Sequence, residues 1–87
     1  MKSQEVTICL ENGLEARPVA VLVQVATKYD SNVYIQTDGK KVNAKSIMGM
    51  MSLGLDIGEK VIVIAEGEDE DLAIGGVCKF LSGKGKE

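Results

Sequence analysis

The sequence contains no histidine, no tryptophan and only two cysteines among its 87 residues. Cys9 and Cys78 lie far apart, and a structural zinc site takes four ligands, most often cysteine and histidine. The residues for a zinc site of this kind are missing, and we expect no metal and no other cofactor. The two cysteines are expected to be reduced, partly buried thiols, and a redox pair is the alternative.

Aromatic residues are also scarce, at 3% of the chain, with one phenylalanine and two tyrosines. The apolar fraction is nevertheless 45%, so valine, isoleucine, leucine and methionine must fill the interior. A chain of this length allows one modest core, which buries roughly two-thirds of the surface of the unfolded chain. No repeat or linker divides the sequence, and we expect a single domain over residues 1–87.

Positive charge is in the minority, since ten lysines and arginines accompany thirteen acidic residues, for a net charge of −3. A nucleic-acid-binding domain would show a basic patch, so we expect neither nucleic acid nor an acidic membrane surface as a partner. No apolar run approaches the ~20 residues needed to cross a bilayer. No apolar block of signal-peptide length follows residues 1–5, and a cytoplasmic protein is expected.

Four segments have the pattern of strands. Alternation over residues 5–11 predicts a half-buried strand. Its buried face carries Val6, Ile8 and Leu10, and its open face carries Thr7, Cys9 and Glu11. Residues 33–37 and 40–43 predict two strands joined by a hairpin turn at Asp38-Gly39. Residues 60–66 predict a buried strand.

Three segments favour helices, the first of them ambiguously. In residues 16–29, alternating valines favour a strand, whereas Pro18 suits a first helical turn. A helical stripe is formed by Ala16, Ala20, Val23 and Thr27. Residues 46–52 predict a short helix capped by Ser46, and residues 70–82 predict a last helix.

The last helix has two notable features. Gly75-Gly76 lies inside it and costs roughly 1 kcal/mol per glycine against alanine, so this helix should be the softest element. The acidic run over residues 66–71 does not follow a calcium-loop pattern. It predicts a solvated helix start, with anions at the positive end of the helix dipole.

Two motifs resemble the HPr phosphocarrier family of the bacterial sugar phosphotransferase system. The loop Gly13-Leu14-Glu15-Ala16-Arg17-Pro18 is similar to the family's active-site loop, Gly-(Leu/Ile)-His-Ala-Arg-Pro. Residues 39–54, GKKVNAKSIMGMMSLG, are similar to the region around the family's regulatory serine, which Ser46 matches. The similarity runs from about residue 6 to residue 81 and covers nearly all of the chain.

The resemblance implies an α+β fold, the HPr-like open-faced β-sandwich. Its element order is βαββαβα, and a four-stranded antiparallel sheet carries three helices on one face. This order makes residues 16–29 a helix.

The first motif implies a phosphate site that lacks its acceptor, because Glu15 stands where the family has histidine. The other two requirements of a phosphoryl group remain: a helix start, at Ala16, and a cation, Arg17. Glu15 is open to three interpretations: a permanent mimic of phosphohistidine, an anion that stabilises a helix N-terminus by about 0.3–1 kcal/mol, or an unusual phosphoryl acceptor. A laboratory replacement of the histidine in a conventional HPr is a further alternative.

A branch of the family, the Crh-like proteins of catabolite repression, offers a precedent for losing this histidine. These proteins have glutamine at the position of Glu15 and keep the regulatory serine. The resemblance therefore implies a non-enzymatic, regulatory protein that does not relay phosphate through histidine. It leaves open a monomer or a dimer that exchanges its first strand.

The second motif implies phosphorylation of Ser46 by HPr kinase/phosphorylase, with simple N-capping as the alternative. A phosphate at a helix start gains from exposed amides, and three nearby lysines are expected to screen it: Lys40, Lys41 and Lys45. The family uses this region to bind the kinase and a catabolite control transcription regulator. The resemblance assigns such contacts to Arg17, Ile47, Met48 and Met51, with phosphotransferase-system enzymes as further candidate partners.

Overall fold

The computed structural model describes residues 1–9, 16–53 and 58–83. Within them the elements follow the order β1 (Lys2–Thr7), α1 (Ala16–Thr27), β2 (Asn32–Thr37), β3 (Lys40–Asn43), α2 (Ile47–Met51), β4 (Lys60–Glu66) and α3 (Glu70–Leu81). This is the predicted order βαββαβα, which is therefore confirmed.

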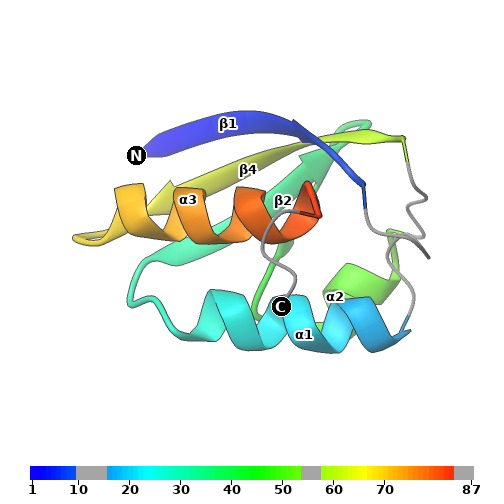
Figure 1. Cartoon of the computed structure of the whole chain (residues 1–87), viewed down its shortest axis with the longest axis horizontal. Coiled ribbons are helices and arrows are strands. Elements are labelled where there is room, and N and C mark those ends of the chain that lie inside the picture. The colour runs from blue at the N-terminus through cyan, green and yellow to red at the C-terminus, as the bar shows by residue number, and fades with distance from the viewer. Residues whose placement is uncertain (10–15, 54–57, 84–87) are drawn as a thin grey trace.

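The strands form one antiparallel sheet in the order β1-β4-β2-β3. The three helices lie on one side of it and leave the other side open (Figure 1). The predicted open-faced sandwich is confirmed.

The core lies between the sheet and the helices and is built from aliphatic side chains and methionine. Val61, Val63 and Ala65 alternate along β4 and face the helices, with at most 1% of their surface exposed. The other large apolar side chains that are fully buried are Ile8, Val19, Leu22, Val33, Ile35, Met50, Val77 and Leu81. The scarcity of aromatic residues predicted such a core.

The ambiguous segment forms the helix α1, because its buried residues have helical spacing. Val19, Leu22 and Ala26 are fully buried, at i, i+3 and i+7. The predicted helix is confirmed, but the predicted stripe is one position away from the buried one. The helix also ends at Thr27 rather than at residue 29.

The hairpin between β2 and β3 is confirmed at Asp38-Gly39. Both residues have positive φ, 49° and 79°, as a two-residue type I′ turn requires. Asparagine or aspartate followed by glycine is the pair that adopts this conformation most easily, which is why the sequence predicts it.

The first strand departs from the prediction, since β1 begins at Lys2 and ends at Thr7. Lys2 through Glu5 are exposed, because β1 is an edge strand that, among the described residues, pairs with β4 alone. These residues therefore lack the alternation that marks a half-buried strand. Ile8 is fully buried just beyond the strand, whereas Leu10 and Glu11 lie outside the described residues.

The two cysteines have different environments. Both are free thiols, and Cys78 is buried, which raises the pKa of its thiol. Cys9 is exposed, so the expectation of partial burial was wrong for it; its N–H donates to the Leu81 carbonyl at 2.8 Å. Among the described residues, no cluster of acidic, cysteine or histidine side chains could hold a metal. The same residues include no helix long and apolar enough to span a membrane.

Candidate functional site

Ser46 caps the N-terminus of α2, as the sequence predicts. Its backbone is extended (φ −110°, ψ 115°), and its Oγ accepts a hydrogen bond of 3.1 Å from the N–H of Gly49. Its carbonyl accepts from the N–H of Met50 at 3.0 Å. The residue is partly exposed, so this N-cap lies at the surface of the protein.

The turn before Ser46 is fixed by the side chain of Asn43. Asn43 Oδ1 accepts from the N–H of Lys45 at 2.8 Å, and the Asn43 carbonyl accepts from the N–H of Ser46 at 3.0 Å. Between them, Ala44 is fully buried and donates its N–H to the Val33 carbonyl at 2.8 Å. Ser46 is thus held by a short turn after β3 in which the N–H groups of residues 44–46 are all hydrogen-bonded.

Three apolar side chains of α2 remain exposed next to Ser46. Met48 is 82% exposed, and Ile47 and Met51 are each 47% exposed. These three residues are called the α2 patch below. Met50, in contrast, is fully buried and anchors α2 in the core. A helix of five residues can bury only one side, so Met50 is buried whereas Met48 and Met51 remain exposed.

Two of the three lysines that were expected to screen a phosphate on Ser46 contact other residues in the structure. Lys41 Nζ lies 4.7 Å from the ring centroid of Tyr34, in a cation–π contact. Lys45 Nζ donates to the Tyr29 carbonyl at 2.8 Å. Lys40 is exposed on β3.

The phosphate-site residues of the first motif are described only in part. Glu15 lies outside the described residues, and Ala16 and Arg17 are the first two residues of α1. α2 packs against α1, near the end at which α1 begins (Figure 1). The start of α1 and the helix α2 therefore lie on the same side of the molecule.

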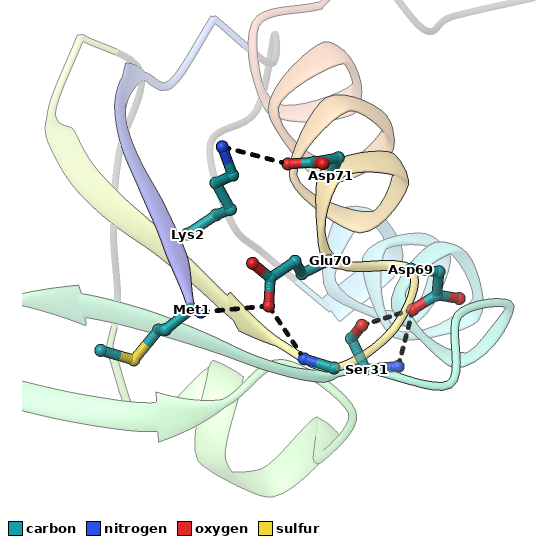
Figure 2. Close-up of polar contacts among 7 residues, drawn as sticks. Met1, Lys2, Ser31, Asp69, Glu70 and Asp71 are labelled. Atoms are coloured by element: carbon teal, nitrogen blue, oxygen red, sulfur yellow. Dashed lines mark hydrogen bonds and ion pairs between the residues drawn. The ribbon is translucent and has the colours of Figure 1, made fainter.

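A polar cluster that the sequence did not predict joins the start of α3 to the turn after α1. The Asp69 carboxylate accepts from the N–H groups of Asp30 and Ser31, each at 2.9 Å. It also accepts from the hydroxyl of Ser31, and Figure 2 shows its two bonds to Ser31. Ser31 is only 1% exposed. The Ser31 hydroxyl, followed by the Asp30 N–H, lowers the pKa of the Asp69 carboxyl below its ordinary value.

The carboxylates of Glu70 and Asp71 form ion pairs with the first two residues of the chain. The Met1 ammonium lies 3.2 Å from Glu70 Oε1, and Lys2 Nζ lies 3.4 Å from Asp71 Oδ1 (Figure 2). The N–H of Gly67 donates to Glu70 and is the largest cause of the lowered pKa of that carboxyl, followed by the Met1 ammonium. The predicted helix start is confirmed, since α3 begins within the acidic run and Glu66, Glu68 and Asp71 are exposed. The prediction did not include the partners that three of the carboxylates bind. No local pattern reveals this, because the partners are distant in sequence.

The architecture is that of a small open-faced β-sandwich domain, and a capped, partly exposed serine stands at the start of its second helix. The family model described as the PTS HPr component phosphorylation site matches residues 2–82. The chain therefore belongs to the HPr family.

Within the family, the chain is 53% identical to the HPr-like protein Crh of Bacillus subtilis, over 93% of this chain and 95% of that protein. A crystal structure of HPr from Thermoanaerobacter tengcongensis matches with a TM-score of 0.92 at 46% identity, over 100% of this chain and 98% of the other. The crystal structure of selenomethionyl Bacillus subtilis Crh matches with a TM-score of 0.81 at 45% identity, over 100% of both chains.

Proposed function

We propose that this protein is a regulatory HPr-like protein of catabolite repression that is switched by phosphorylation of Ser46. The observation that carries the proposal is the position of this serine, a partly exposed N-cap bordered by the exposed α2 patch. A phosphoryl group there adds about −1.5 to −2 charge beside an apolar surface. Such a change alters what the surface can bind while the buried side of α2 stays in the core.

The proposed partners are HPr kinase/phosphorylase, which modifies Ser46, and a catabolite control transcription regulator, which reads the modification. The α2 patch offers two methionines, whose flexible and polarizable side chains suit a binding surface. Arg17 supplies a polar contact at the start of α1. Enzymes of the phosphotransferase system are the second set of candidate partners.

Phosphate relay through histidine has no acceptor in this chain, since the sequence contains no histidine. There are two alternatives. The protein could be a phosphocarrier that uses Glu15 to form an acyl phosphate, or a conventional HPr in which the histidine has been replaced. A glutamate next to a helix start and an arginine is a stabilised anion and a weak nucleophile, which favours the regulatory function. The protein acts by binding other proteins, and we propose no catalytic activity.

We further propose that the chain is cytoplasmic and occurs as a monomer or as a dimer that exchanges β1. The crystal structure of selenomethionyl Crh reveals a swapping domain and a dimer. In the part of the present chain that the structure describes, β1 is an edge strand whose one neighbour in the sheet is β4. Its detachment therefore breaks a single ladder of backbone hydrogen bonds.

A paired phosphorylation assay with site mapping by mass spectrometry tests the function. One arm contains HPr kinase and ATP, and the other contains the upstream enzyme of the phosphotransferase system and phosphoenolpyruvate. We expect label on Ser46 in the first arm, its loss in Ser46→Ala, and no label in the second arm. Acid-labile label on Glu15 would instead establish the carrier function. Glu15→His should gain label in the second arm if the surface that binds the upstream enzyme is intact.

A further inference from the structure

We propose that Lys45 is a positioning residue for Ser46, an inference that rests on the function proposed for that serine. Lys45 Nζ donates a hydrogen bond of 2.8 Å to the backbone carbonyl of Tyr29, which lies 16 residues earlier. The ammonium group is thereby bound to the segment after α1. Its role is to hold the turn that presents the serine hydroxyl.

Lys45 is anchored through both its backbone and its side chain. Its N–H donates to Asn43 Oδ1 at 2.8 Å, while its Nζ is bound to the Tyr29 carbonyl. Ser46 follows directly and donates its own N–H to the Asn43 carbonyl at 3.0 Å. The position of the serine therefore depends on a residue that ties the turn to another part of the fold.

The Tyr29 carbonyl belongs to a segment that is held by several contacts. The N–H of Tyr29 donates to the Ala26 carbonyl at 3.2 Å, and the Tyr29 ring lies against Gly76 of α3. The next two residues, Asp30 and Ser31, are bound by the Asp69 carboxylate. The contact of Lys45 thus connects the Ser46 turn to the place where α1, β2 and α3 meet.

Removal of this contact should loosen the turn without opening the core. The hydrogen bond is charge-assisted and partly buried, a combination that makes it stronger than an exposed neutral one. A kinase that binds a loosened turn must first order it, which weakens productive binding. Lys45→Met should therefore lower kcat/KM for phosphorylation of Ser46 by about tenfold, mostly through KM. Lys45→Arg keeps a charged donor and should recover a large part of this loss.

Amide hydrogen exchange on the free protein tests the contact without any kinase. The relevant amides are those of Lys45, Ser46 and Gly49, each of which donates a hydrogen bond in or next to the turn. Exchange at all three should accelerate by about tenfold in Lys45→Met. Lys41→Met removes the same charge from a lysine that contacts Tyr34 instead, and it should leave these amides unchanged.

The same variants are then assayed with HPr kinase and ATP. Faster exchange together with a raised KM in Lys45→Met, absent from Lys41→Met and reduced in Lys45→Arg, supports the proposal. A raised KM with unchanged exchange would mean that the kinase contacts Lys45 directly, and faster exchange with unchanged kinetics would mean that the turn needs no positioning. Either result overturns the proposal. If wild-type Ser46 takes no label, the proposed function fails, and the exchange data alone decide whether Lys45 holds the turn.

Discussion

The side chain of Tyr29 occupies the space that a side chain at Gly76 would need. A Cβ placed on Gly76 would lie 2.1 Å from the Tyr29 hydroxyl oxygen, whereas a Cβ on Gly75 would meet nothing within 4 Å. The sequence treats the two glycines alike, as residues that weaken α3. The structure gives them different roles, because only Gly76 makes room for a neighbour.

The first prediction follows from this difference. Gly75→Ala should raise the free energy of unfolding by about 0.5–1 kcal/mol, since alanine is the better helix former and meets no clash. Gly76→Ala should lower it by about 1–3 kcal/mol, because the Tyr29 ring must move. Urea unfolding of both variants measures the two effects. Equal stabilisation by both would show that the tyrosine yields at no cost, and Tyr29→Ala should remove the penalty at Gly76.

Local patterns predicted most of the elements because their causes are local. Asp38-Gly39 fits a turn that needs two positive φ angles, and Ser46 fits an N-cap whose partner is three residues away. Residues 16–29 were undecided on pattern alone because alternating valines and a helical stripe coexist there. The family resemblance decided between them in favour of the helix.

The remaining features depend on contacts between distant residues. Strand β1 is placed by its pairing with β4, in the register Lys2 to Ala65 through Thr7 to Lys60, and exposed edge residues show no alternation to reveal it. The bond between Asp69 and Ser31 spans 38 residues. An aspartate before a helix looks like an ordinary N-cap, and the structure shows that its side chain makes no cap hydrogen bond.

The second prediction concerns stability in acid. Hydrogen bonds lower the pKa of the Asp69 carboxyl in the folded state below its ordinary value of 3.8, so folding favours the ionised form. This contribution is present above the ordinary pKa and is lost as the pH falls through the lowered one. Thermal unfolding between about pH 5 and pH 2 should therefore show a loss of stability that is smaller in Asp69→Asn.

Ser31→Ala provides a second test of the same bond. The Ser31 hydroxyl is the largest cause of the lowered pKa of Asp69, and its removal should weaken the acid dependence while leaving the backbone donors in place. If Asp69→Asn and the wild type lost stability in parallel as the pH fell, the acid dependence would come from other carboxyls. The Glu70 carboxyl, whose pKa is also lowered, would then be the next to examine.

The third prediction separates the binding and the packing methionines of α2. Met48 is 82% exposed and Met50 is fully buried. Met48→Ala should change the free energy of unfolding by less than about 0.5 kcal/mol and weaken binding to the kinase or the regulator. Met50→Ala should cost about 2–5 kcal/mol of stability because it leaves a cavity in the core. Comparable unfolding by both variants would assign Met48 to the core and remove it from the α2 patch.

The fourth prediction separates capping from regulation at Ser46. Ser46→Ala removes the acceptor for the Gly49 N–H and should lower the free energy of unfolding by about 1 kcal/mol. Ser46→Asp keeps an acceptor of equal capping quality and adds a negative charge, so its stability should stay close to that of the wild type. Ser52→Ala is the matched control, because Ser52 lies at the other end of α2 and donates to the Gly49 carbonyl at 2.6 Å.

Capping and regulation predict different effects of Ser46→Asp on the affinity for the regulator. If Ser46 only caps α2, calorimetry should find the same affinity for the regulator in Ser46→Asp and the wild type, since both keep the cap. If the charge at this position is the signal, Ser46→Asp should change that affinity while Ser46→Ala, which is less stable but uncharged, should not. A change in binding that followed stability across the three variants, rather than charge, would reduce Ser46 to a structural cap.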